Sequence, residues 1–215
     1  MSRRKPADDR KAEIVAAVLV LADRVGPDRL TTGDIAREVG VTQAAIFRHY
    51  PTKAALWVAA GQGIAHRMQS GWQQALDQAS QPGQGGQPPD ADPDPVLRLR
   101  GLISAQVRQV QAIPALPAIL HSRELNVDNP ALRDLFRGLM QQFQTHLMTA
   151  LQDLIALGRL APDLHPADAA VLLMSTMQGL AIRWSLGSRA FDLHAEGLRL
   201  LDVQLRLMAR KDGTP

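Results

Sequence analysis

Residues 31–53, TTGDIAREVGVTQAAIFRHYPTK, decide the fold of the N-terminal part of this chain. Thr31 and, three residues later, Asp34 form a capping-box pattern, which predicts the start of a helix. Gly40 stands where a helix commonly ends in the left-handed conformation, which glycine tolerates best. Thr42 can then cap a second helix. The stretch therefore predicts two short helices joined by a tight turn.

The second helix, expected over residues 43–50, presents a polar and basic face that suits the major groove of DNA. A helix fits that groove, and the residues at its N-terminal end reach the base edges. Gln43 can pair with adenine, Ala44 can contact a thymine methyl group, and Arg48 can read guanine or hold a phosphate. The alternative is that these side chains are simply solvated, and that Tyr50 belongs to the core. The residues expected to hold backbone phosphates are Thr32, Thr42, Tyr50 and Lys53.

The composition limits the classes of function. The chain has 215 residues, enough for one or two domains with a large core, and 46% of them are apolar. It contains no cysteine, which excludes disulfides, thiolate metal sites and cysteine nucleophiles. No apolar run approaches the ~18 residues of a membrane span, and the N-terminus lacks the apolar core of a signal peptide. We therefore expect a cytoplasmic protein with no membrane association, no cofactor and no metal.

The formal net charge of +3 is concentrated at one end of the chain. Residues 1–60 hold ten Lys and Arg against seven Asp and Glu, whereas residues 61–215 hold fourteen of each kind. The whole excess lies in the segment that contains the two-helix unit, as expected for a surface that faces phosphates. A solubilising tail is the alternative, because Arg3, Arg4 and Lys5 alone account for three charges.

Helical periodicity runs through almost the whole chain, and strand-like alternation is absent. An apolar helix over residues 8–25 precedes the two-helix unit and is stopped by Gly26-Pro27. A long fourth helix is expected over residues 53–79, with Thr52 as its cap. Further helices are expected over residues 96–112, 118–125, 131–157, 167–186 and 192–209. The pattern predicts an all-α fold.

The first 57 residues or so resemble the tetracycline-repressor (TetR) family of transcriptional regulators. The features are an apolar helix ending in Gly-Pro and then LTTGDIAREVGVTQAAIFRHYPTKAALW over residues 30–57. The resemblance implies a three-helix helix-turn-helix domain, followed by a helical domain that binds a small molecule and pairs two subunits. It carries over, as recognition-helix or phosphate positions, Gln43, Ala44, Phe47, Arg48, His49 and Lys53.

Two positions depart from the family pattern. Phe47 stands where the family usually has a tyrosine whose hydroxyl donates to phosphate, so Phe47 can supply only packing. Gly33 stands where some relatives carry a basic residue that reads a base. That difference indicates fewer base contacts from the first helix of the unit.

The domain organisation follows from the helices and the resemblance together. We expect a helix-turn-helix DNA-binding domain over residues 1–57, joined through the long fourth helix to an effector-binding and dimerisation domain over residues 58–215. Residues 80–95, SQPGQGGQPPDADPDP, are typical of a flexible loop. We interpret this loop as an insertion within the second domain, the alternative being a true interdomain linker.

Dimerisation is needed if the two-helix unit is to recognise a specific site. One copy reads only a few base pairs, whereas two copies related by a two-fold axis read a palindrome in double-stranded DNA. The last two expected helices carry more apolar side chains than one small core obviously uses, although internal packing is the alternative. The candidate interface residues are Leu173, Leu180, Trp184, Leu198, Leu201 and Leu205.

Methionine and aromatic side chains of the second domain are candidates for a ligand pocket. Such a cavity would suit an apolar or aromatic effector, although the same residues also form ordinary cores. Arg123 and Gln178 could supply polar contacts. The full set of candidates is Met68, Trp72, Arg123, Phe136, Met140, Phe143, Met174, Met177 and Gln178.

The expected function is that of a homodimeric repressor released by a small molecule. A ligand that prefers one setting of the fourth helix can shift DNA affinity only by its differential affinity for the two settings. An enzyme is not expected, because the six histidines are dispersed and no HExxH, Gly-rich phosphate loop or GxSxG occurs. The alternative is an effector-independent DNA-binding protein with an architectural or partner-recruiting role.

Overall fold

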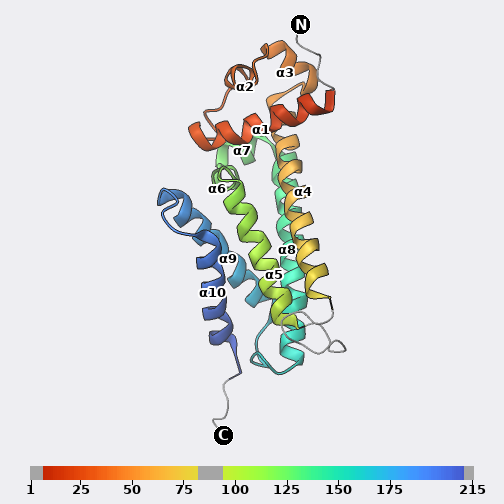
Figure 1. Cartoon of the computed structure of the whole chain (residues 1–215), viewed down its shortest axis with the longest axis vertical. Helices are drawn as coiled ribbons and strands as arrows, with labels where there is room; N and C mark the ends of the chain where they lie inside the picture. The colour runs from red at the N-terminus through yellow and green to blue at the C-terminus, as the bar shows by residue number, and fades with distance from the viewer. Residues whose placement is uncertain (1–6, 82–93, 211–215) are drawn as a thin grey trace. The chain divides into compact units, whose positions relative to one another are not determined.

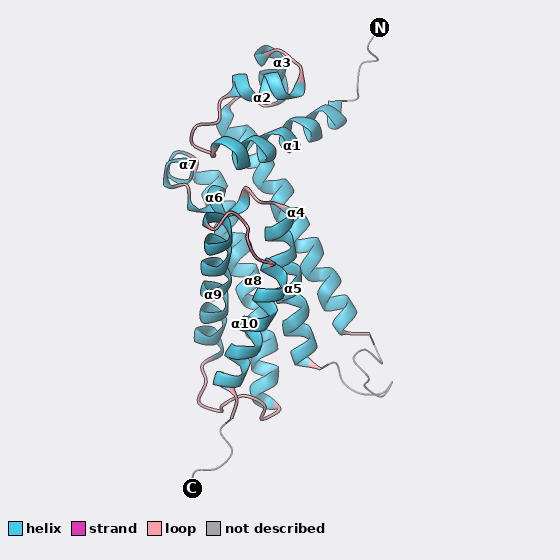
Figure 2. Cartoon of the chain, turned by 60° about the vertical axis from the view of Figure 1, so that its left-hand side comes forward, coloured by secondary structure: helices cyan, strands magenta, loops and turns pink. Residues whose placement is uncertain are grey.

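The computed structural model describes residues 7–81 and 94–210, and the regular structure in these ranges is helical (Figure 2). The all-α fold expected from the sequence is confirmed. The helices are α1 (Ala7–Val25), α2 (Thr32–Val39), α3 (Gln43–His49), α4 (Lys53–Ala79), α5 (Pro95–Ala112), α6 (Leu116–His121), α7 (Arg123–Asp128), α8 (Pro130–Ala156), α9 (Pro166–Leu186) and α10 (Leu193–Met208) (Figure 1).

Most helix boundaries lie within one residue of those expected, with one exception around Ser122. The sequence predicts a single helix over residues 118–125, whereas the structure has two, α6 and α7. Ser122 ends the first helix in an extended conformation, and its Oγ accepts a hydrogen bond from the backbone N–H of Leu125 at 2.9 Å. This N-cap starts α7 as a separate helix.

Two parts of the expected organisation fall largely outside the described residues. These are the flexible loop over residues 80–95, of which residues 82–93 are not described, and the basic residues Arg3, Arg4 and Lys5. Within the described ranges, no helix is both long and apolar enough to cross a membrane.

The chain divides into two compact units. Unit 1 comprises residues 1–66 and 113–138, and unit 2 comprises residues 67–112 and 139–215. The compact units group α6, α7 and the first part of α8 with the N-terminal helices. The functional division at residues 57 and 58 expected from the sequence stays a prediction. The polypeptide passes from one unit to the other within α4, directly after α5 and within α8.

Unit 1 has a core formed by apolar side chains from the three N-terminal helices and from α4, α6 and α8. Ile14 on α1, Ile35 on α2 and Ile46 on α3 are each almost fully buried, as expected from their spacing. A side-chain hydrogen bond of 3.0 Å from Asn129 to the backbone oxygen of Ala54 joins the start of α8 to the start of α4. The three-helix unit therefore packs against a supporting layer that comes from later in the chain.

Unit 2 is built from longer helices, with α10 lying beside both α5 and α9 (Figure 1). The ring of Trp72 stacks on that of Phe143 with 4.9 Å between centroids, and its indole N–H donates to Gln106 at 3.0 Å. Arg98 forms an ion pair with Asp153 at 2.6 Å, and Arg100 forms another with Asp202. Partly exposed pairs of this kind contribute little, so apolar burial dominates the stability of this unit.

Candidate nucleic-acid interface

The start of α2 is fixed by a complete capping box, as the sequence predicted. Thr31 Oγ1 accepts from the backbone N–H of Asp34 at 3.2 Å, and the backbone N–H of Thr31 donates to Asp34 Oδ2 at 3.1 Å. The hydrogen bond from the Thr31 hydroxyl, with smaller help from Arg37, lowers the pKa of the Asp34 carboxyl below its usual range. An ionised Asp34 therefore holds α2 in place at neutral pH.

The turn from α2 into α3 is fixed by Gly40 and Thr42. Gly40 has φ 72° and ψ 36°, the left-handed region in which most other residues are strained. Thr42 is the N-cap of α3, and its Oγ1 accepts from the backbone N–H of Ala45 at 3.2 Å. Two capped helices of eight and seven residues are thus held at a defined angle by local chemistry.

The outer face of α3 carries the residues expected to read bases. Ile46 faces inward and is buried, whereas Gln43, Ala44 and Arg48 are exposed. Phe47 is 42% exposed despite its apolar ring. An exposed aromatic ring flanked by a glutamine and an arginine on one short helix suits a partner that offers both base edges and sugar-phosphate.

The other expected DNA-binding residues surround this face. Thr42 is exposed at the start of α3, and His49 is half-buried at its end. Thr32 is half-buried in the first turn of α2, and Lys53 is half-buried in the first turn of α4. These positions are compatible with phosphate contacts, and their role in DNA binding stays a prediction.

Tyr50 does not have the free hydroxyl that a phosphate donor needs. Its hydroxyl donates to the backbone oxygen of Lys11 at 3.3 Å, which joins the end of α3 to α1. Burial also raises the pKa of this hydroxyl. The structure therefore favours a packing role for Tyr50, which is half-buried and holds the end of α3 against α1.

Gly33 has a role that sequence reasoning missed. A Cβ atom at this position would lie 2.7 Å from Nε2 of Gln43, so the side chain of Gln43 passes directly over the bare backbone of α2. The placement of the candidate adenine-reading side chain therefore depends on a residue of the preceding helix. The sequence showed that Gly33 lacks the basic side chain of some relatives. It did not show that the absence of a side chain at this position makes room for Gln43.

The candidate effector residues do not all belong to one unit. Arg123 and Phe136 lie in unit 1, and the exposed Arg123 is on α7. The other seven lie in unit 2, where Trp72 and Phe143 already pack against each other. Met68 and Met177 are buried there, Met174 and Gln178 are half-buried, and Met140 is 39% exposed.

Most of the candidate interface residues are core residues of a single chain. Leu173, Leu180, Trp184 and Leu201 are buried within unit 2, so in this structure they offer no surface to a second copy. Leu198 and Leu205 are half-buried. The exposed apolar side chains of α9 and α10 are instead Val171, Leu172, Leu186 and Leu207.

Two family models match this chain. The model described as "Bacterial regulatory proteins, tetR family" matches residues 14–60, which contain α2 and α3. The model described as "BetI-type transcriptional repressor, C-terminal" matches residues 95–208, more than half of the chain. In the described ranges, no group of three or more His, Asp or Glu side chains is placed to hold a metal ion.

Individual relatives are similar at lower identity. The nucleoid occlusion factor SlmA of Vibrio vulnificus is 27% identical over 146 residues, covering 67% of this chain and 68% of that protein. SlmA of Shewanella loihica is 23% identical, covering 93% and 96%.

Solved structures share the fold. A TetR transcription regulator from Haloarcula marismortui has a TM-score of 0.74 at 20% identity, covering 94% of this chain and all of the other. The regulator FadR from Bacillus subtilis, solved in complex with stearoyl-CoA, has a TM-score of 0.69 at 15% identity, covering 92% and 97%. Taken with the capped α2–α3 unit and the two family models, these likenesses lead to one assignment: the chain belongs to the tetR family of bacterial regulatory proteins.

Proposed function

We propose that this protein is a sequence-specific transcriptional repressor that binds a palindromic DNA site as a homodimer. The observation that supports this most strongly is the exposed face of α3, where Gln43, Ala44 and Arg48 lie on a helix fixed at both ends. A helix held in this way can enter the major groove with little loss of conformational freedom. Thr32, Thr42 and Lys53 then hold the flanking phosphates.

The dimer forms through the exposed apolar faces of α9 and α10. Leu172 is 55% exposed and Leu207 is 78% exposed, which leaves apolar surface that a second copy could cover. Open space surrounds the position of a Cβ at Gly179, so a partner helix can approach this part of α9 closely. A symmetric pair would present two α3 helices to half-sites about 34–36 Å apart, or at a related spacing.

The repressor is released by a small apolar or aromatic molecule that binds among the methionine and aromatic residues of unit 2. The adaptable side chains of Met174 and Met177 on α9, and the aromatic pair of Trp72 and Phe143 in the same unit, support this part of the proposal. A regulator of the same fold has been solved with an acyl-CoA, a ligand with a long apolar chain. A coupling of roughly 1–3 kcal/mol between ligand and DNA would be typical.

The test is selection of bound sequences from random DNA duplexes, followed by affinity measurements on the recovered site. Gln43→Ala should cost about 1–3 kcal/mol of binding and relax the preference at one position of each half-site. Lys53→Ala should weaken binding to all sequences alike and reduce the salt dependence. Gln62→Ala, at an exposed position of α4, is the matched control and should bind as the wild type does. Recovery of no palindrome would refute the proposal.

A second candidate function is favoured by the relatives described as nucleoid occlusion factors. Such a protein would bind DNA without release by an effector and act through a protein partner. Mapping of bound sites along the chromosome separates the two functions. A few sites next to promoters would support the repressor, whereas many dispersed copies of one palindrome would support the second candidate.

A further inference from the structure

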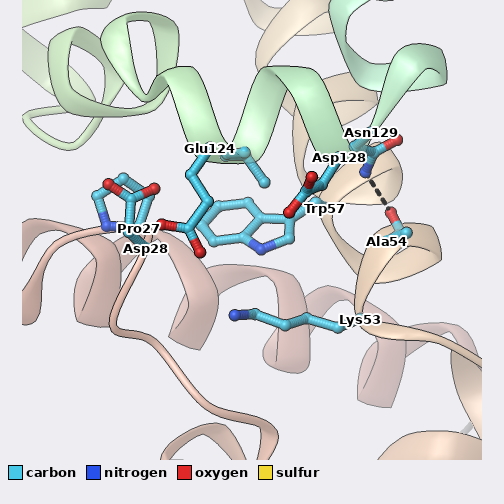
Figure 3. A pocket seen from close by; sticks show the side chains of 9 residues that line it. Pro27, Asp28, Lys53, Ala54, Trp57, Glu124, Asp128 and Asn129 are labelled. Carbon is cyan, nitrogen blue, oxygen red and sulfur yellow. Dashed lines mark hydrogen bonds between the residues drawn. The ribbon is translucent and has the colours of Figure 1, made fainter.

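A pocket lies within unit 1, away from the residues expected to bind the effector. It has a volume of about 200 Å³, and its walls come from the turn after α1, the first turns of α4, and α7 with the residue that follows it (Figure 3). The hydrogen bond from the Ser122 hydroxyl to Asp28 ties the turn after α1 to the N-cap of α7. The hydrogen bond from Asn129 to Ala54 fixes the opposite end. The pocket is therefore bounded by contacts that hold its shape.

Trp57 brings to the pocket a polar group that has no partner among the described residues: its ring is buried, but its indole nitrogen is not one of the buried atoms. Its side chain is only 3% exposed, and its indole N–H has no hydrogen-bond acceptor among residues 7–81 and 94–210. Figure 3 shows the ring in the pocket between Glu124 and Asp128, with its nitrogen on the side where Lys53 lies. A tryptophan N–H usually finds an acceptor, so this donor is available to a ligand atom or a water molecule in the pocket.

The charges around the pocket favour a ligand with a net positive charge. Asp28, Glu124 and Asp128 contribute three carboxylates, whereas Lys53 contributes the single ammonium group. In the described part of the chain no ion pair joins Lys53 to Glu124 or to Asp128. The lining therefore offers two kinds of partner at once: donors at Lys53 and Trp57, and acceptors at the carboxylates.

We propose that this pocket binds a basic amino acid or a close analogue, a molecule with one carboxylate and a net positive charge. The ligand carboxylate accepts from the indole N–H of Trp57 and from the Lys53 ammonium group. Its cationic end lies against Glu124 and Asp128, where the opposite charges attract and the exposed mouth accommodates a long side chain.

Binding here would also regulate DNA affinity. This consequence depends on the function proposed above, in which Lys53 holds a phosphate. A ligand carboxylate that occupies the Lys53 ammonium group competes with that phosphate, so the free ligand and DNA would weaken each other's binding by the same factor.

The binding test uses the full chain and L-arginine as the probe. The three tryptophans give three indole N–H signals in an NMR spectrum, and Trp57→Phe identifies the signal of Trp57. Millimolar L-arginine should shift this signal and leave those of Trp72 and Trp184 in place. Agmatine, which lacks the carboxylate, should bind more weakly. An unchanged Trp57 signal, or tighter binding of agmatine, would overturn the proposal.

Two variants show where the probe binds. Glu124→Gln combined with Asp128→Asn keeps the shape of the pocket, removes two charges at exposed positions, and should reduce the affinity for arginine at least tenfold. Asp163→Asn, an exposed carboxylate in unit 2, is the matched control and should leave the affinity unchanged. Equal affinity in the double variant and the control would place the probe elsewhere and refute the site.

The regulatory consequence is tested separately on DNA. At matched ionic strength, arginine should lower the DNA affinity of the wild type several-fold and leave the weaker affinity of Lys53→Ala unchanged. If the Trp57 signal shifts but the protein binds no DNA, the pocket stands and the proposed function fails. If DNA binds but the Trp57 signal does not move, the pocket fails and the function stands.

Discussion

Trp57 and Trp72 lie on the same helix, one in each unit, and their surroundings differ. Both are almost fully buried, at 3% and 1% exposure. Trp72 stacks on Phe143 and donates to Gln106, whereas the indole N–H of Trp57 opens into a pocket without an acceptor in the described ranges. In unit 2 the polar N–H of the buried tryptophan bonds to a neighbouring long helix. In unit 1, which contains the short capped helices, the corresponding N–H has no acceptor among the described residues. The polar group without a partner in this comparison therefore lies in unit 1, although the proposed dimer and effector sites lie in unit 2.

The largest expected effect distinguishes a core leucine from an exposed leucine of the proposed interface. Leu201 is fully buried within unit 2, so Leu201→Ala should lower the free energy of unfolding by about 2–5 kcal/mol. Leu207 is 78% exposed, so Leu207→Ala should change the unfolding of the isolated chain by less than about 0.5 kcal/mol and weaken the dimer instead.

Denaturant unfolding at several protein concentrations, together with sedimentation, measures both effects. If only Leu201→Ala lost stability in a way that depends on protein concentration, Leu201 would be an interface residue, as the sequence analysis had suggested. The expected loss for Leu201→Ala is the same at every concentration.

The next effect compares the two tryptophans directly. Both Trp72→Phe and Trp57→Phe remove similar volume, but only the first also breaks a hydrogen bond and reduces the ring area stacked on Phe143. Trp72→Phe should therefore cost about 1–2 kcal/mol more than Trp57→Phe. Thermal and chemical unfolding of both variants measures the difference. Equal losses of unfolding free energy in the two variants would mean that the indole N–H of Trp57 also forms a stabilising hydrogen bond, and would contradict this difference.

A smaller effect compares threonines at a helix cap and within a helix. Thr31→Ala removes the two hydrogen bonds of the Thr31 hydroxyl but keeps the bond from its backbone N–H to Asp34. The change should cost about 1 kcal/mol, with weaker DNA binding because α2 frays. Thr149 lies inside α8, where its hydroxyl donates to the backbone oxygen of Thr145 at 3.1 Å. Thr149→Ala should be neutral or stabilise slightly, because alanine is the better helix former. Unfolding curves and DNA titrations of both variants measure these differences.

The smallest effect is a difference in pH dependence. Burial lowers the pKa of His146 and of His194 in unit 2, and nearby Arg108 lowers that of His194 further. The unfolded chain binds these protons more readily, so stability from unit 2 falls as pH drops below the ordinary histidine value of 6.5.

In unit 1 the lowered pKa of Asp34 affects stability only at more acid pH. Its contribution is present above the ordinary value of 3.8 and is lost as pH falls further. Stability measured from pH 7 downward should therefore fall first through unit 2, and His146→Gln should remove part of that early loss. An early loss unaffected by this variant would contradict the assignment to His146.

The sequence predicted the features that are encoded locally. Thr31, Gly40 and Thr42 act through bonds to residues at most four positions away, so their pattern was enough to place α2 and α3. Apolar periodicity also located the long helices, because a buried face repeats along a helix whatever covers it. Periodicity cannot say what covers that face, so the sequence left open whether Leu173 and Leu201 belong to an interface or to the core, and the structure buries both within one chain.

Features that depend on distant residues could not be predicted. The pocket beside Trp57 is lined by residues from 27–28, 53–57 and 124–129. No local sequence pattern predicts that these distant segments lie close together. The separation of α6 from α7 depends on the N-cap at Ser122. From the sequence alone, a serine at this position is equally compatible with the interior of a single helix. The grouping of Phe136 with unit 1 likewise follows from tertiary packing alone.

The close approach of Gln43 to Gly33 has a consequence for how such proteins diverge. A Gly33→Ala change would push aside the end of a flexible side chain without disturbing the backbone that holds it. A duplicated copy of this gene could therefore acquire a different operator preference while every residue of α3 stayed the same. If Gln43 reads a base as proposed, paralogues compared by their α3 helices alone would be judged identical in specificity although residue 33 differs.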